Sequence, residues 1–162
     1  MKIGADALEG CPAEAKAFLQ ETGLPLSVIT IFQADAEPAR TSVTIGGRTV
    51  DGLVLGHSRE EDPLFLDYAD GAVWLLASWR PAAPIPVNAG VTAFVESLAL
   101  VASAYPFYPA DADLDDAGSA EDRLRESLET IDVVSTADPD GFWSAFLNDV
   151  GVGDYGDDGD DR

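Results

Sequence analysis

The order in which two hydrophobic patterns follow one another limits the fold of this chain more than any single motif. Residues 28–76 hold short apolar and β-branched segments separated by tight turns, which is typical of strands. Residues 12–22 and 88–150 instead repeat apolar side chains three and four positions apart, as helices do. Tight turns join antiparallel neighbours. The order therefore predicts an α+β fold: a mainly antiparallel sheet of five or six strands, with an N-terminal helix and about three C-terminal helices packed on it.

The strand-like segments can be placed individually. We expect them at 28–32, 41–45, 48–50, 53–55, 64–66 and 73–76. Gly46 and Gly47 separate the second segment from the third. Because glycine accepts positive φ without steric cost, a two-residue glycine loop predicts a hairpin there.

Helix starts carry their own signals. Asn88 is expected to cap a long helix, because an apolar stripe follows it directly. Ser119 and Asp122 resemble a capping box for the next helix. Asp138-Pro139 is expected to open the last one. These helices complete a single predicted domain over residues 1–153.

Acidic residues dominate the charge of the chain. Thirty acids face nine Lys and Arg, which gives a net charge of −21. The tail 154–162, expected to be flexible, carries −4 and the stretch 111–122 carries −6, so −11 remains on the rest. Such a field repels nucleic acid and anionic membranes and speeds association with basic partners. Solubility, or the residue bias of a GC-rich genome, explains the charge equally well.

The composition points to a reducing compartment. Cys11 is the only cysteine, so no internal disulfide can form, and no basic–apolar leader is recognisable at the N-terminus. No apolar run approaches the ~18 residues that span a bilayer. We therefore expect a cytoplasmic protein.

A search for catalytic motifs finds none. His57 is the only histidine, too few for a zinc site beside one cysteine, and no Gly-x-Ser-x-Gly or phosphate-binding loop occurs. Asp111-x-Asp113-x-Asp115 begins like a calcium loop, but Asp116 stands where glycine is needed. We expect no cofactor, no metal and no catalytic site. An enzyme that uses carboxylates alone remains an alternative, because a fold can assemble such a pair from any of the thirty acids.

Protein binding is the function that these exclusions favour, and two regions are candidates for it. Trp79 stands in an apparent loop. An aromatic cluster interrupted by Pro106 and Pro109 precedes an acidic run, and either partner binding or core packing explains the aromatic residues. The candidate partner-binding residues are Trp79, Tyr105, Phe107, Tyr108, Asp111, Asp113, Asp115 and Asp116.

Several segments together resemble one protein family. They are 17–25 (Ala-Phe-Leu-Gln-Glu-Thr-Gly-Leu-Pro), 66–67 (Leu-Asp), 70–74 (Asp-Gly-Ala-Val-Trp), 86–88 (Pro-Val-Asn), 131–132 (Ile-Asp) and 142–143 (Phe-Trp). In this order they are similar to the fourth subgroup of the SUKH superfamily, which is common in actinobacterial genomes. Ala89 and Gly90 depart from the serines expected at the helix start. The acidic run and the tail are not features of the family pattern.

The resemblance implies a SUKH-like α+β adaptor fold without catalytic residues. Many members are immunity proteins that bind and block a toxin domain, often a nuclease or a nucleic-acid deaminase. The expected partner is therefore a cognate toxin domain with a basic surface, occluded by this chain, with no binding to nucleic acid or membrane. The alternative is an intracellular adaptor of the same fold that has no toxin partner.

Overall fold

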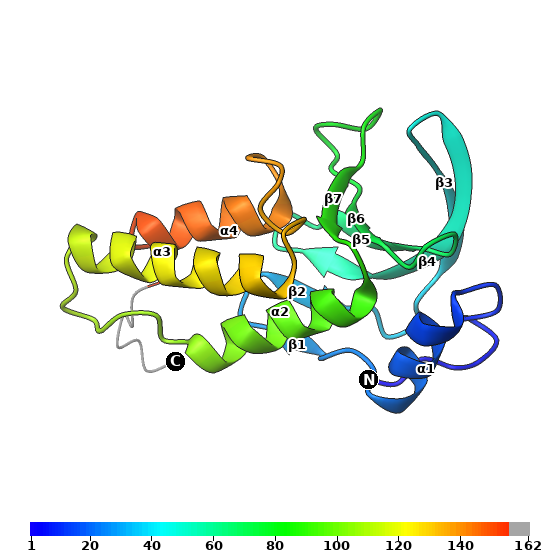
Figure 1. The fold of residues 1–162 in the computed structure, drawn as a ribbon, viewed down its shortest axis with the longest axis horizontal. Coiled ribbons are helices and arrows are strands. Elements are labelled where there is room, and N and C mark those ends of the chain that lie inside the picture. Colours follow the sequence, from blue (N-terminus) through cyan, green and yellow to red (C-terminus); the bar gives the residue numbers. More distant parts are fainter. Residues whose placement is uncertain (156–162) are drawn as a thin grey trace.

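Helices flank a run of strands, as the order of the sequence patterns predicts. A computed structural model describes residues 1–155. Within this range, α1 (Ala13–Glu21) precedes seven strands, and α2 (Val91–Ala104), α3 (Leu114–Ile131) and α4 (Phe142–Gly151) follow them (Figure 1). The α+β class and the mainly antiparallel sheet are confirmed. Residues 156–162 of the predicted tail lie outside the described residues.

The sheet is antiparallel at every pairing. Its order is β1-β2-β4-β5-β6-β7, and β3 pairs with β4 beside β2. The long β4 strand curls, so the β3–β4 hairpin rises away from the helices (Figure 1). The strand bounds are β1 (Ser27–Val28), β2 (Phe32–Ala34), β3 (Arg40–Ile45), β4 (Arg48–Ser58), β5 (Pro63–Asp67), β6 (Val73–Leu75) and β7 (Ile85–Asn88).

The glycine hairpin forms as predicted. Gly46 and Gly47 take φ values of +57° and +78°, and β3 and β4 pair from Ile45 and Arg48 outward. The segments predicted at 48–50 and 53–55 are one continuous strand. Their link includes Gly52, where a Cβ would lie 2.1 Å from a backbone oxygen of β5. Glycine there permits close approach and does not end the strand.

The prediction of one strand over 28–32 is wrong. Ile29 takes a φ of +48°, and the chain reverses so that Val28 pairs with Phe32. The intervening Ile31 is only 3% exposed. Ile31 is apolar because it packs into the core. The composition of the turn therefore resembles that of a buried strand.

Three predicted helix starts are displaced. Asn88 is the last residue of β7, and Gly90 precedes α2. The third helix begins at Leu114, well before the predicted box at Ser119 and Asp122. The last helix begins at Phe142. In each case a turn-forming polar residue lies near the helix, but the backbone amides are capped elsewhere or left without a side-chain cap.

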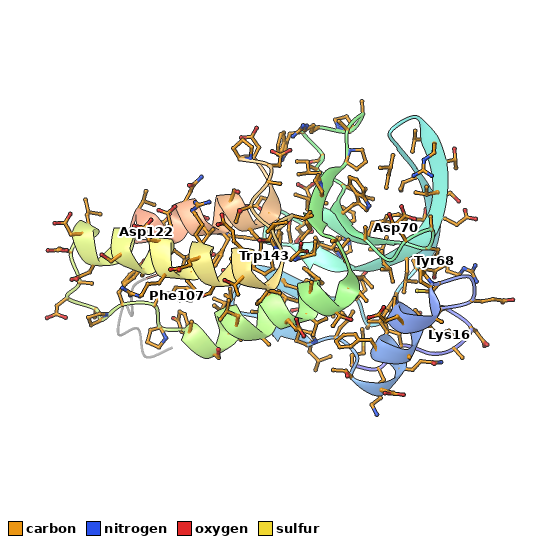
Figure 2. The ribbon with its side chains drawn as sticks, viewed as in Figure 1. Lys16, Tyr68, Asp70, Phe107, Asp122 and Trp143 are labelled. Atoms are coloured by element: carbon orange, nitrogen blue, oxygen red, sulfur yellow. The ribbon has the colours of Figure 1, made fainter. Side chains whose placement is uncertain are left out.

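The core lies between the sheet and the helices. α2 packs on β1 and β7, α4 packs on β7, and α3 packs on α2 and α4. Fully buried side chains from both layers meet there, with Trp143 between α4 and the sheet (Figure 2). A smaller apolar cluster, formed by Ile45, Val50 and Phe65, lies elsewhere on the sheet. Because α3 packs on other helices, its outer side faces solvent.

Candidate protein-binding site

The acidic run forms the start of α3. Asp113 Oδ1 accepts a hydrogen bond from the Asp116 amide at 2.9 Å, and Asp116 Oδ2 accepts from the Asp113 amide at 3.3 Å. This reciprocal arrangement is a capping box, and the carboxylates also complement the positive end of the helix dipole. Asp113 and Asp116 therefore hold the helix start, while Asp111 and Asp115 are exposed without that task.

The acidic residues at the start of α3 and on its solvent side have little compensating positive charge beside them. Within residues 1–155, the ion pair on α3 joins Arg125 to Glu121 at 2.7 Å, and none involves residues 111–116. Asp122 lies on the same helix and is exposed (Figure 2). The solvent side of α3 therefore presents an excess of carboxylates, which favours a positively charged partner.

The aromatic cluster divides into buried and exposed members. Phe107 and Tyr108 are 8% and 7% exposed, whereas Tyr105 is 45% exposed. The ring of Phe107 lies 5.6 Å from that of Phe146, and the Tyr108 hydroxyl donates to the Val150 carbonyl at 3.1 Å. Phe107 and Tyr108 pack in the core, which is one of the two interpretations that the sequence left open, and their part in partner binding stays a prediction. Tyr105 keeps an accessible ring.

Trp79 lies in the loop between β6 and β7 and is 57% exposed. It lines a pocket beside α4 whose lining also includes Ile31, Phe142, Phe146 and Tyr155. The pocket follows α4, a helix about 15 Å long, from the residues before its start to Asp149 near its end. The prediction that Trp79 stands in a loop is confirmed, and its exposure keeps it a binding candidate.

The structure does not bring Trp79 and the acidic run into one pocket. Trp79 shares its pocket with residues of α4, whereas the acids begin α3. Tyr155 lines the Trp79 pocket, and its ring lies 5.9 Å from that of Phe107, which precedes the acidic run in the chain. The candidates therefore form two separate surfaces linked through a buried aromatic ring.

Charged residues that the sequence did not single out join Trp79. Arg59 Nη1 lies 3.6 Å from Asp149 Oδ2, and Glu60 also lines the pocket. Desolvation by burial raises the pKa of the Asp149 carboxyl; Arg59 opposes the shift, and Asp154 and Glu60 add to it. About ninety positions separate these groups along the chain, so no local motif marks them.

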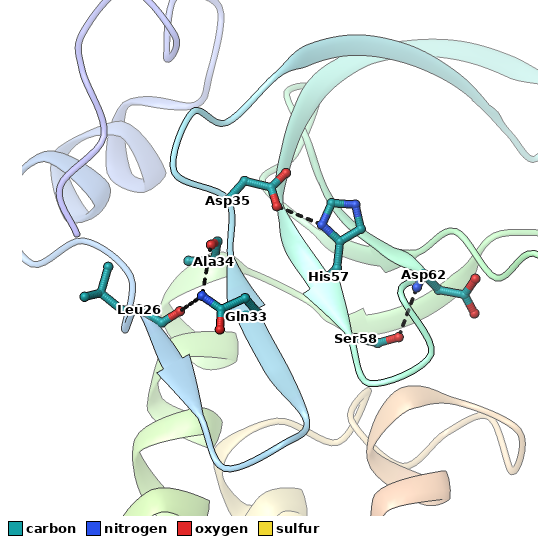
Figure 3. Close-up of polar contacts among 7 residues, drawn as sticks. All are labelled: Leu26, Gln33, Ala34, Asp35, His57, Ser58 and Asp62. Atoms are coloured by element: carbon teal, nitrogen blue, oxygen red, sulfur yellow. Dashed lines mark hydrogen bonds and ion pairs between the residues drawn. The ribbon is translucent and has the colours of Figure 1, made fainter.

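His57 is part of the sheet. It pairs with Gln33 across β4 and β2, and its Nδ1 lies 2.7 Å from Asp35 Oδ1 (Figure 3). The neighbouring Ser58 hydroxyl is directed to Glu60 Oε2 at 3.4 Å. The histidine and the serine beside it therefore form no nucleophile–base pair.

Across residues 1–155, no group of three or more His, Cys, Asp or Glu side chains is placed to hold a metal ion. In the same range, no helix has the length and apolar character required to cross a membrane.

Two glycines in the family-like segments stand where other residues would be strained. Gly23 ends α1 with a φ of +80°, and a Cβ there would lie 2.2 Å from the Met1 carbonyl oxygen. Gly71 takes a φ of +81° in the turn after β5. Asp67 stabilises the same turn, because its Oδ1 accepts from the Ala69 amide at 2.7 Å.

A buried polar network joins three other family-like positions. The Asn88 side-chain amide donates to Asp132 Oδ2 at 3.0 Å, and Asn88 Oδ1 accepts from Trp143 Nε1 at 2.9 Å. The network ties the end of β7 to α4 and to the residue after α3. The segments that resemble the family therefore hold the architecture together.

Comparison with known proteins supports the resemblance of these segments to one family. No curated protein and no solved structure matches the chain. The sequence model of one family, described as SUKH-4 immunity protein, matches residues 5–149. That range runs from the segment before α1 into α4 and contains all the family-like segments. The chain belongs to the SUKH-4 immunity protein family.

Proposed function

We propose that this protein neutralises a bacterial toxin by binding it and covering its working surface. The observation that carries the proposal is the family match over residues 5–149, because the family is one of immunity proteins. Binding of a protein toxin then needs no catalytic group in this chain. The positions that resemble the family stabilise the fold, so we propose that this chain acts by covering the toxin and not by chemistry.

The charge of the chain supports a basic target. The net charge of −21 includes exposed, unpaired carboxylates at the start of α3, such as Asp111 and Asp115. A nuclease or nucleic-acid deaminase holds its substrate's phosphates with Lys and Arg. An acidic protein docked on such a groove competes with the substrate for the same side chains. We therefore propose a nucleic-acid-processing toxin as the partner.

Electrostatic steering is the expected benefit of this match. Opposite charges raise the rate at which two proteins meet in the right orientation, whereas apolar and aromatic contacts slow their separation. An immunity protein must capture its toxin before the toxin reaches nucleic acid. A high association rate serves that need directly.

Co-expression with a toxin tests the proposal in cells. Any toxin domain encoded beside this gene is expressed from an inducible promoter, with and without this chain. We expect the toxin alone to stop growth and the pair to grow normally, and the two proteins to purify together from the rescued cells. Growth arrest that this chain does not relieve would contradict immunity and leave a non-toxin adaptor as the better interpretation.

A further inference from the structure

A hollow beside α4 combines an exposed tryptophan with carboxylates. It is formed by the β1–β2 turn, the end of β4 with the turn that follows, the end of β6 with the β6–β7 loop, and α4 with the residues on either side of it. Its volume is about 200 Å³, several times the ~30 Å³ that one water occupies. The hollow is therefore large enough to admit a side chain from another molecule.

The inner wall of the hollow is apolar and fixed. Ile31, Leu75 and Phe146 line it, and each is between 3% and 6% exposed, so these side chains are held by the core. Trp79 stands at the same site with more than half of its surface in water. A large exposed aromatic residue beside a preformed hollow is typical of the central contact of a protein interface.

The rim of the hollow is acidic. Among residues 1–155, its lining contains four carboxylates against one cation, Arg59. Asp62 is only 4% exposed, and its Oδ1 accepts a hydrogen bond from the Ser78 amide at 2.9 Å. Glu60, Asp140 and Asp149 remain, and the ion pair of Arg59 within the described part of the chain joins it to Asp149, at 3.6 Å. Burial is the largest cause of the raised pKa of Asp149; Arg59 opposes the shift, and Asp154 and Glu60 add to it.

We propose that the hollow receives an arginine side chain of the toxin, with its guanidinium between the Trp79 ring and the carboxylates of Asp149 and Glu60. This inference rests on the proposed function and names the contact that holds the complex. A guanidinium suits the site because it is planar, stacks on an indole and binds carboxylates through several N–H donors at once. Its aliphatic stem matches the apolar wall.

A small-molecule probe tests the site without any toxin. The ¹⁵N-labelled full chain is titrated with N-acetyl-arginine methylamide, and in parallel with the citrulline compound, which has nearly the same shape without the charge. We expect the Trp79 indole signal and the Arg59 and Asp149 amide signals to shift and saturate with the arginine compound only. Trp79→Ala should abolish the shifts at Arg59 and Asp149.

Two results of the titration would overturn the inference. One is an equal response to the citrulline compound, because charge would then play no part. The other is a shift at exposed acids outside the hollow, such as Glu9 and Asp122, as large as that at Asp149, because the probe would then sense only the overall charge. A separate titration with the corresponding lysine compound tests the choice of arginine, and equally strong binding would overturn that choice.

Variants of the full complex test the same contact in its proposed setting. Trp79→Ala and Asp149→Asn should each weaken toxin binding roughly 30-fold or more, as central interface residues do. The matched controls are Leu26→Ala and Glu9→Gln. Leu26 directly precedes β1 and is 65% exposed. These controls should change affinity less than about twofold, and thermal unfolding should show all four variants folded.

The two proposals fail separately. If the unaltered chain neutralises the toxin but Trp79→Ala and Asp149→Asn bind it as tightly as the unaltered chain does, the arginine site is wrong and immunity stands. If the probe titration succeeds but the toxin is not neutralised, the site exists and immunity is wrong.

Discussion

At the scale of single residues, Asn88 joins parts of the fold that are distant in sequence. It is completely buried, and its side chain bonds both Trp143 and Asp132. Asn88→Ala leaves the buried Trp143 N–H without its acceptor, and such a group costs about 1–3 kcal/mol. We expect the free energy of unfolding in urea to fall by that amount.

The control for this change is Asn148→Ala. Asn148 is an exposed residue of α4, so the substitution should alter the free energy of unfolding by less than about 0.5 kcal/mol. Equal losses for the two variants would show that the network around Trp143 does not contribute to stability.

Asp149 provides a prediction about pH. Burial raises its pKa in the folded state, so folding favours the protonated carboxyl. The stability that this preference contributes is present at low pH and is lost as pH rises through the folded-state pKa. Asp149→Asn, which stays neutral, should therefore be at least as stable as the unaltered chain at pH 7.

Urea unfolding over a range of pH checks this prediction. The difference between Asp149→Asn and the unaltered chain should shrink as pH falls into the range where Asp149 is protonated. A variant that is clearly less stable at pH 7 would mean that the ion pair with Arg59 outweighs the burial of the carboxyl.

At the scale of elements, the start of α3 distinguishes the predicted cap from the observed one. Asp113 accepts from the Asp116 amide, whereas the Ser119 hydroxyl donates to a carbonyl within the helix. Asp113→Ala should cost about 1 kcal/mol, the usual value for a lost cap. Ser119→Ala should change stability by less than about 0.5 kcal/mol, because its hydroxyl caps no amide. Thermal unfolding of both variants measures this, and a larger loss for Ser119→Ala would contradict the observed helix start.

The sequence predicted the elements with regular patterns better than those that depend on tertiary contacts. The apolar stripes of α1 and α2, and the Gly46-Gly47 hairpin, carry local signals and were placed correctly apart from their ends. The β1–β2 turn was not predicted because Ile31, which packs into the core, is apolar like a residue of a buried strand. β7 was missed because Pro86 lies within it, at the point where its register with β6 shifts.

The candidate site was predictable only in its single exposed aromatic residue. Trp79 was recognised because it stands in a loop. Its companions Arg59 and Asp149 come from a different turn and from a helix, and only the fold brings them together. Phe107 shows the converse difficulty: an aromatic residue between prolines has no local feature that separates core packing from binding.

At the scale of the whole molecule, the excess of acids affects how fast a partner arrives. At physiological salt, charges are screened beyond about 8 Å, so only surface charges near the contact steer strongly. We therefore expect the association rate with the toxin to fall as salt rises, while the dissociation rate changes less. Stopped-flow measurements at two salt concentrations test this. An association rate independent of salt would remove the role given to the acidic surface.

Titration of toxin activity shows directly whether this chain neutralises a toxin. The purified toxin domain is mixed with increasing amounts of this chain, and turnover of its own substrate is followed. We expect activity to fall to the background level and to stay there once the toxin is saturated. Full toxin activity in the presence of a large molar excess of this chain would contradict this expectation.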